Sequence, residues 1–228
     1  MNKRGLGDTA NDIALYGSKL YIVVNVSSTI EVIDFQTGIS IKQIPMFTDN
    51  GSSRQPRHIA FYENKAYVCS FDGTVARIDT TSLQIESFTK AGRNPENICV
   101  KNKKLYVSNS GGLDYSEGLG VWDMKSEQLV GTWNRLLNSR VSGLRIWDDR
   151  TVLVATDGEG IFRMDIVNPD ITSFIQTDFE NDNSIRTNRI ADVFVDDQKL
   201  IWVADYPEGV SMIDVESPDD YKWYRARS

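Results

Sequence analysis

The chain has 228 residues, 40% of them hydrophobic and 25% charged, a composition typical of globular proteins and unlike that of disordered or fibrous chains. Its formal net charge of −7 argues against a general nucleic-acid-binding protein, and no apolar run approaches the roughly 20 residues that a membrane span needs. Two cysteines cannot make a disulfide scaffold, one histidine excludes most His-paired sites, and the first residues lack the apolar stretch of a signal peptide, so we expect none.

The first predicted strands lie within residues 8–47. Ile13–Leu15 is a short apolar run, and a polar turn joins it to Leu20–Val24, which is rich in β-forming residues. A third run ends at Ile33-Asp34, and a fourth, Ile39–Ile44, follows the next turn. Alternation and β-branched content predict that all four are strands, and no segment of ten or more residues shows convincing helical periodicity.

The same arrangement recurs four more times along the chain. In each copy an apolar run, a polar turn and a second β-rich run precede two further strands. The paired runs are Ile59–Phe61 with Ala66–Ser70, Ile98–Val100 with Leu105–Ser108, Leu144–Ile146 with Val152–Ala155, and Val193–Val195 with Ile201–Ala204. The chain therefore contains five copies of one four-stranded unit.

An apolar residue followed by aspartate ends the third strand of every copy. The aspartates, 42 to 49 residues apart, are Asp34, Asp79, Asp123, Asp165 and Asp214. Three residues after each comes a hydroxyl or amide side chain, namely Thr37, Ser82, Ser126, Asn168 and Ser217. An aspartate at this offset accepts N–H bonds from the turn that it opens, so we interpret the five as structural and not catalytic.

Four short antiparallel strands in each unit of about 46 residues predict an all-β fold, a five-bladed β-propeller. The expected blades of this single domain are 8–47, 55–92, 94–138, 139–182 and 183–228. Each blade holds four consecutive strands, so we expect a monomeric ring that closes by packing of Trp223 and Tyr224 on the first blade. The alternative is an open arc that self-associates with a second copy.

Blades one to three share a family pattern. Its residues are the strands Leu20–Ile22, Ala66–Val68 and Leu105–Asn109 and the loops Gln55–Ile59 and Asn94–Ile98. This part of the chain resembles the YVTN-type, quinoprotein-like propellers of bacterial surface and periplasmic proteins.

Blades four and five carry another pattern. Asn183–Ile185 and Asn188–Ile190, followed by Val195–Asp197 and Ile201–Ala204, resemble the two-component regulator propeller repeats of hybrid histidine kinase sensor domains. The two resemblances imply that the parent families are proteins of the periplasm or the cell surface.

The change of pattern falls inside blade three. The motif Glu-Gly-apolar-x-x-apolar-Asp occurs at Glu117–Asp123, Glu159–Asp165 and Glu208–Asp214. Blade three therefore ends with the pattern of blades four and five. The switch between the two patterns lies between about Ser110 and Glu117. Both parent families usually have more than five blades. We therefore interpret the chain as a recombined or engineered hybrid; the alternatives are a natural mosaic and a fragment.

Candidate ligand-binding residues lie where the innermost strands begin. The position before the first apolar residue of these strands holds Asp12, His58, Asn97, Gly143 and Asp192. The adjoining loops carry Arg54, Arg57, Arg93, Arg140 and Arg189. In a propeller these positions line the channel mouth, where guanidinium groups bind carboxylate, phosphate or sulfated sugars. The predicted ligand-binding set consists of all these residues except Gly143 and Arg54. A wet, polar channel without a ligand is the simpler interpretation.

The other conspicuous side chains favour structural roles. The loop Ser110–Gly118 carries Asp114 and Tyr115, which could contact a sugar. We favour the interpretation that this loop is only a loosely packed connection where the two patterns join. The acidic group of Asp178, Glu180 and Asp182 lacks the glycine and terminal glutamate of a calcium loop.

Buried roles are expected for the cysteines and for three tryptophans. Cys69 and Cys99 lie in apolar strands as reduced thiols, and Trp122, Trp147 and Trp202 fill blade interfaces. A surface role is expected for three loop residues, Asp157, Asp205 and Tyr206.

The sequence holds no nucleophile elbow, phosphate-binding loop, dinucleotide-binding glycine pattern or HExxH motif. We predict a non-enzymatic propeller scaffold with no catalytic residue, metal or cofactor. The first alternative is a sensing module that binds a glycan or another anionic small molecule. The second is a glycoside-active enzyme that uses Asp12 or Asp192.

Overall fold

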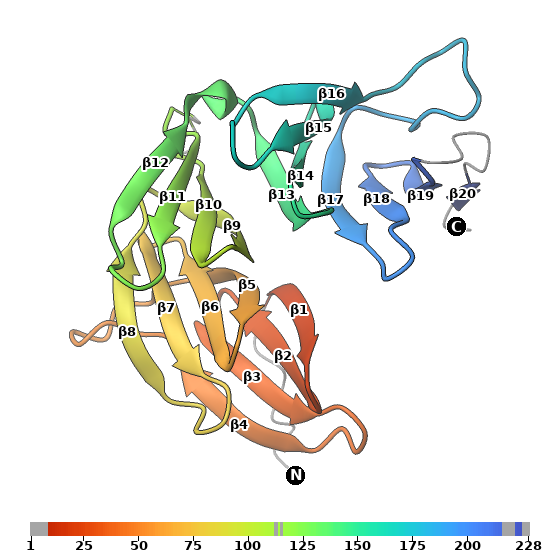
Figure 1. The fold of residues 1–228 in the computed structure, drawn as a ribbon. Coiled ribbons are helices and arrows are strands. Elements are labelled where there is room, and N and C mark those ends of the chain that lie inside the picture. Colours follow the sequence, from red (N-terminus) through yellow and green to blue (C-terminus); the bar gives the residue numbers. More distant parts are fainter. Residues whose placement is uncertain (1–8, 112–113, 115, 216–221, 225–228) are drawn as a thin grey trace. The chain divides into compact units, whose positions relative to one another are not determined.

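The computed structural model describes residues 9–111, 114, 116–215 and 222–224, with the backbone alone of 222 and 223. These residues form five four-stranded antiparallel sheets, the blades of a β-propeller, and one short 3-10 helix, η1 (Asn134–Leu136) (Figure 1). Each sheet contains four consecutive strands in sequence order. The fold class predicted from the repeat is thereby confirmed.

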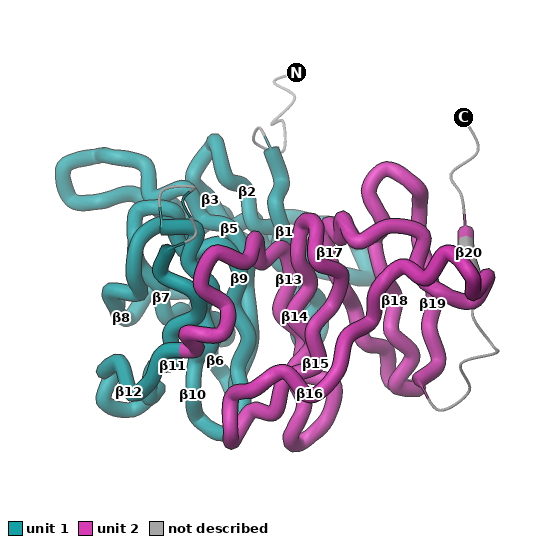
Figure 2. The backbone as a smooth tube through the Cα atoms, turned by 90° about the horizontal axis from the view of Figure 1, so that it is seen from above, with its two compact units in different colours: residues 1–132 teal, residues 133–228 magenta. Residues whose placement is uncertain are grey.

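The chain divides into two compact units, residues 1–132 and 133–228, which Figure 2 shows in different colours. The first unit holds three blades. Blade one consists of β1 (Ala10–Tyr16), β2 (Lys19–Val24), β3 (Thr29–Asp34) and β4 (Ser40–Pro45). Blade two consists of β5 (Pro56–Tyr62), β6 (Lys65–Ser70), β7 (Thr74–Asp79) and β8 (Ile85–Lys90). Blade three consists of β9 (Pro95–Lys101), β10 (Lys104–Asn109), β11 (Leu119–Asp123) and β12 (Leu129–Trp133), whose last residue belongs to the second unit.

The second unit holds the other two blades. Blade four consists of β13 (Val141–Ile146), β14 (Thr151–Thr156), β15 (Gly160–Asp165) and β16 (Ile171–Ile175). Blade five consists of β17 (Ile190–Val195), β18 (Ile201–Asp205), β19 (Gly209–Ile213) and β20 (Lys222–Tyr224). Every predicted strand pair lies within these bounds. No described helix is long and apolar enough to cross a bilayer.

The apolar cores lie between blades. One cluster joins Tyr21 and Val23 of blade one to Ile59 and Val68 of blade two. A second joins blades two and three, and a third joins blades four and five. Successive residues of a strand point to opposite faces, so a middle strand such as β6 contributes to two clusters and is buried on both sides. One blade therefore cannot cover its own apolar faces.

Two of the three tryptophans lie where the sequence indicated. Trp122 is buried in the cluster between blades two and three. Trp147 packs on the cluster between blades four and five, and its Nε1 donates to the Lys199 carbonyl at 3.3 Å. Trp202 differs, because it stacks on Tyr224 of its own blade at 6.0 Å between ring centroids. The side chain of Trp223, expected to close the ring, lies outside the described residues.

Four of the five turn aspartates hold their turns as predicted. Oδ1 of Asp79 accepts the N–H groups of Thr81 and Ser82, at 3.0 and 2.7 Å. Asp34, Asp123 and Asp165 accept backbone N–H bonds of the same kind. These bonds lower the pKa of these carboxyl groups, and in Asp79 the Lys65 ammonium contributes most. The turn after Asp214 lies outside the described residues.

Both cysteines are buried and neither forms a disulfide, as predicted. Desolvation by burial raises the pKa of Cys69 to about 12, so this thiol stays protonated at neutral pH.

Candidate functional site at the innermost strands

A register shift recurs at one place in every blade, where the innermost strand begins to pair with the second strand. The shifts involve Asp12, His58, Gly143 and Asp192 directly, and in blade three the pairing shifts beside Asn97. A β-bulge turns a side chain out of the regular alternation of its strand. The five predicted positions therefore share the same irregularity of strand pairing.

In blade one, the irregular pairing directs the Asp12 carboxylate to the backbone of two strands. Oδ1 accepts the N–H of Ile13, and Oδ2 accepts the N–H of Ile59 in blade two, each at 2.9 Å. Because β1 lies beside β5, the second bond joins the innermost strands of neighbouring blades. Asp12 thus links two blades.

His58 occupies the same position in blade two and makes the corresponding link to blade three. Its Nδ1 lies 2.5 Å from the backbone oxygen of Glu96. A carbonyl oxygen can only accept, so Nδ1 carries the proton. The neighbouring Arg57 donates from Nε to the Glu96 carboxylate at 2.9 Å. His58 is therefore a satisfied histidine within a blade interface.

Asn97 is the third residue of β9, the innermost strand of blade three, and is buried. Its backbone N–H donates to Oγ of Ser108 at 3.1 Å. Its side-chain Oδ1 is buried without a hydrogen-bond partner in the structure.

In the second unit, Gly143 and Asp192 meet at the interface of blades four and five. Asp192 accepts the N–H of Val193 at 2.8 Å, as Asp12 does with Ile13, and its second oxygen accepts from Nη2 of Arg145 at 2.8 Å. A Cβ on Gly143 would lie 2.5 Å from the Asp192 carboxylate. Glycine at position 143 therefore makes room for that carboxylate.

The predicted arginines are all ion-paired. Arg93 contacts Glu117 at 2.6 Å and Asp114 at 3.5 Å, next to Tyr115, which lies outside the described residues. The remaining pairs are Arg57 with Glu96, Arg54 with Asp72, and both Arg140 and Arg189 with Asp157. The carboxylates raise the pKa of Arg93 and Arg189. An anionic ligand would therefore compete with a carboxylate at each of these guanidinium groups.

Sequence reasoning missed most of these carboxylates. Glu96 follows His58 by 38 residues, close to the spacing of neighbouring blades, and it directly precedes the recognised Asn97 in β9. A search for opposite charges one repeat apart would have found the Arg57–Glu96 pair.

An open depression in the described part of the first unit includes Arg93, a member of the predicted set. It is about 290 Å³ in volume and is lined by Phe71, Asp72, Gly73, Gly92, Arg93 and Asn94. The side chain of Arg93 is 59% exposed there. Its lining combines an aromatic ring, a carboxylate, a guanidinium group and an amide.

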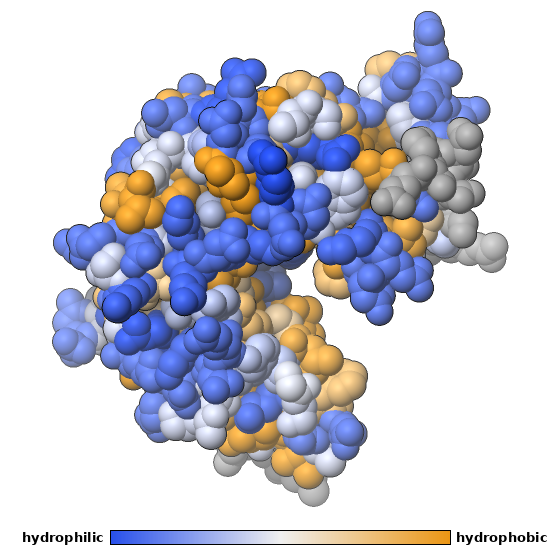
Figure 3. Space-filling model, in the orientation of Figure 1, coloured by the Kyte–Doolittle hydropathy of each residue, from blue (hydrophilic) through white to orange (hydrophobic). Residues whose placement is uncertain are grey.

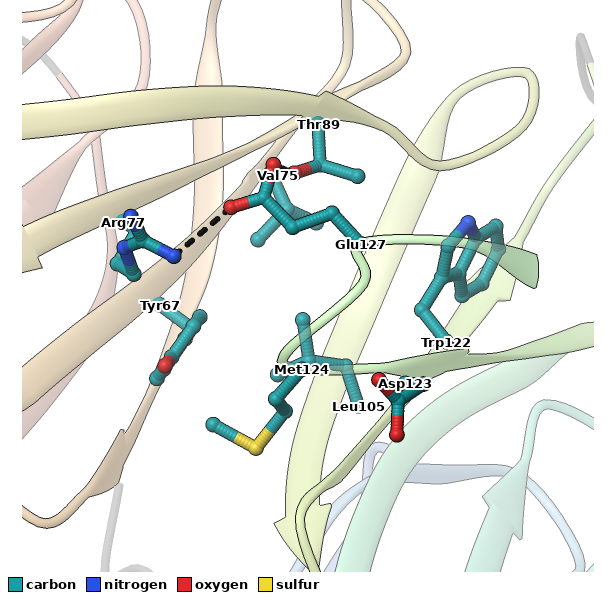
Figure 4. A pocket seen from close by; sticks show the side chains of 9 residues that line it. All are labelled: Tyr67, Val75, Arg77, Thr89, Leu105, Trp122, Asp123, Met124 and Glu127. Carbon is teal, nitrogen blue, oxygen red and sulfur yellow. Dashed lines mark hydrogen bonds and ion pairs between the residues drawn. The ribbon is translucent and has the colours of Figure 1, made fainter. Parts of the chain in front are cut away.

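A second feature missed in the sequence is a half-buried polar contact between blades two and three (Figure 4). Glu127, in the turn after β11, accepts from Nη1 of Arg77 at 2.8 Å and from the hydroxyls of Ser87 and Thr89 at 3.1 and 2.9 Å. The cavity beside it, about 10 Å³ for the centre of a water molecule, holds about one water. It has no room for a ligand.

The expected surface role of Asp205 is wrong. This residue is 5% exposed at the end of β18, a central strand of its sheet, where it is paired with Gly209 of β19. One carboxylate oxygen accepts from the Ser211 hydroxyl, and the other has no partner in the structure. Desolvation raises the pKa of Asp205 to about 6. Asp157 does lie nearer the surface, where it pairs with Arg189.

The acidic group Asp178, Glu180 and Asp182 gives no sign of a metal site. Oδ1 of Asp178 accepts the N–H of Glu180 at 3.0 Å, a local turn bond. Within the described ranges, no group of three potential ligands is arranged to hold a metal ion.

The comparisons with known proteins extend only to the fold. No protein-family model matches the chain, and no curated protein matches its sequence. Among solved structures, the chain is similar to the computationally designed protein Ika8, with a TM-score of 0.63 and 14% sequence identity. The similarity covers 93% of this chain and 60% of Ika8, so the chain spans about three fifths of the length of that designed protein.

Proposed function

We propose that the chain is a non-enzymatic β-propeller scaffold. The observation that carries the proposal is the use of polar groups at the innermost strands. Asp12 and His58 bond to the backbone of the next blade, and the predicted arginines pair with carboxylates. Groups engaged in this way stabilise the fold and have little left to offer a substrate.

The proposal includes the absence of catalysis. The carboxylates with the best claim to acid–base chemistry, Asp12 and Asp192, each accept a backbone N–H group and a second donor. The turn aspartates are likewise engaged. Turnover of a glycoside that is lost in Asp12→Asn or Asp192→Asn would contradict this part of the proposal.

We also propose that the chain is a recombined or engineered hybrid of YVTN-like and regulator-like blades. The change of motif inside blade three supports this origin, and the structural likeness to the designed protein Ika8 is consistent with it.

A ligand-binding module is the second candidate, and the open depression beside Arg93 favours it. Its exposed guanidinium group, together with Asn94 and the Phe71 ring, suits an anionic sugar or another small anion.

A thermal-shift screen with glycans and small anions separates the two candidates. The scaffold predicts no shift that depends on ligand class. A stabilisation of several degrees by one class, absent in Arg93→Gln but kept in the exposed control Arg135→Gln, would replace the scaffold with the binding module. Each variant is compared with and without ligand, so that any change in its own stability cancels.

A further inference from the structure

The segment between β4 and β5 forms a short hairpin with a fixed base. Phe47 pairs with Ser53 in an isolated antiparallel bridge, and the Arg54 N–H donates to the Met46 carbonyl at 3.1 Å. Met46 is fully buried in the cluster between blades one and two, and the Arg54 guanidinium pairs with Asp72 at 2.7 Å. All these residues belong to the first unit. The base of the hairpin is therefore held by the first unit alone.

The tip of the hairpin, residues 48–52, carries the only Asn-Gly sequence of the chain, Asn50-Gly51. The Thr48 carbonyl accepts the Gly51 N–H at 2.8 Å, which closes a tight turn, and Asn50, Gly51 and Ser52 are exposed. The hairpin projects from the edge of the first unit in Figure 1, where Figure 3 shows mainly hydrophilic surface. A backbone hydrogen bond at such an exposed tip opens at little cost in free energy, which makes the Gly51 nitrogen accessible.

The Asn50 side chain lies across the Gly51 peptide group, because its Oδ1 accepts the Ser52 N–H at 3.2 Å. The Thr48 hydroxyl donates to the same oxygen. A backbone N–H can only donate, so the side-chain oxygen of Asn50, and not its amide nitrogen, faces these groups. Two donors on one carbonyl oxygen stabilise the negative charge that this oxygen acquires when a nucleophile adds to its carbon.

We propose that Asn50 is a site of spontaneous deamidation. The Gly51 backbone nitrogen attacks Cγ of Asn50, the new bond closes a succinimide ring, and the bond from Cγ to Nδ2 breaks. The proton of the Gly51 N–H leaves with the amide nitrogen as ammonia. Water then opens the ring at either carbonyl group, which gives aspartate or isoaspartate, each with one more negative charge than asparagine. The reaction needs no ligand or partner and is independent of the proposed function.

Glycine at position 51 favours this reaction in two ways. It has no side chain to hinder the attacking nitrogen, and its φ of 82° is one that glycine adopts without strain, so the tight turn forms. The chain also has three Asn-Ser sequences, at Asn109, Asn138 and Asn183, where the serine side chain crowds the nitrogen. Asn109 is buried as well. Asn50 should therefore react before these three.

Peptide mapping by mass spectrometry tests the proposal on the purified full chain, incubated at neutral and at alkaline pH. The peptide with Asn50 should gain the mass of an amide-to-acid exchange and appear as aspartate and isoaspartate products. Its conversion should be faster at the higher pH, because the attacking nitrogen must lose its proton. Asn138 and Asn183 are exposed internal controls that should convert at least tenfold more slowly. Conversion of a control before Asn50, or an Asn50 that stays intact, would overturn the proposal.

Variants of Thr48 test the role of its hydroxyl. Thr48→Val keeps the shape of the side chain without the hydroxyl and should slow the conversion of Asn50 roughly two- to tenfold, the effect of one hydrogen bond. Thr48→Ser keeps the hydroxyl and should restore the rate. An unchanged or faster conversion in Thr48→Val would contradict the stabilisation of charge on Oδ1. Asn50→Gln should abolish the product, and circular dichroism verifies that each variant is folded.

Discussion

At the scale of single residues, the polar side chain at the innermost bulge is an adaptor between neighbouring blades. Asp12 satisfies an N–H of its own strand and an N–H of β5. A buried or half-buried backbone donor that loses its acceptor costs free energy, so such a side chain contributes more than its own two bonds indicate.

Asp12→Ala should lower the free energy of unfolding by about 1–3 kcal/mol, because the Ile59 N–H loses its acceptor at a blade interface. Asp12→Asn should cost less, since the amide keeps one acceptor oxygen. Urea denaturation measures both, with the exposed loop substitution Asp49→Ala as control. Equal midpoints for Asp12→Ala and the control would show that the link contributes nothing.

Asp205 should make stability fall as pH rises between about 4 and 6. Its pKa is about 6 in the folded state against an ordinary value of 3.8, so the folded state binds its proton more tightly. The stabilisation by the protonated form is complete below pH 4 and is lost as pH rises through 6. The effect is on the order of a few kcal/mol, since the pKa shifts by roughly two units.

Asp205→Asn has no proton to lose, and the pH dependence of its melting temperature from pH 4 to 7 should be correspondingly flatter than that of the wild type. The turn aspartates, whose pKa values are lowered, act in the opposite direction and are common to both proteins. Parallel curves for variant and wild type would contradict the assignment of Asp205.

At the scale of elements, the turn between the third and fourth strands reaches back to the preceding blade. The fourth residue after the turn aspartate has a positive φ in Leu83 and Glu127, at 55° and 57°. Leu83 fills the cluster between blades one and two, and Glu127 accepts three hydrogen bonds from blade two. The same backbone conformation thus directs an apolar side chain in one blade, and a charged side chain in another, to the preceding blade.

Glu127→Ala should destabilise the chain by about 1 kcal/mol, because Arg77, Ser87 and Thr89 lose their common acceptor and the ion pair is partly solvent-screened. Glu127→Gln keeps an acceptor and should cost less. A double-mutant cycle with Arg77→Ala should give a favourable coupling energy of a few tenths of a kcal/mol or more. A coupling of zero would show that the ion pair with Arg77 contributes nothing to the stability.

At the scale of the whole chain, stability is distributed over interfaces between consecutive blades. The clusters of the first unit join blades one to three, and a separate cluster joins blades four and five. Repeat proteins built in this way have stabilities that sum over neighbouring contacts, so a lesion in one interface acts mainly on the blades that share it.

Leu153→Ala should remove about 2–5 kcal/mol from the interface of blades four and five, since Leu153 is fully buried in that cluster. Hydrogen exchange followed by mass spectrometry should show faster exchange in β14 and β17, with β2 and β3 little changed. Uniform acceleration in every blade would show that the chain unfolds as one cooperative block.

The architecture was predictable from the sequence because strand alternation and turn chemistry are local. The five copies, their strand positions and the bonds of four turn aspartates all follow from spacings of a few residues. The polar positions at the innermost strands were also identified from the repeat alone.

The partners of those residues depended on the tertiary structure. The spacing along the chain does not say that Asp12 reaches Ile59, that Glu96 neutralises Arg57, or that Asp205 is buried. Each of these outcomes depends on how one blade lies against the next, and small rotations of a sheet change which distant groups meet. Local propensity therefore determined the blades, whereas packing between them decided the partner of each charged side chain.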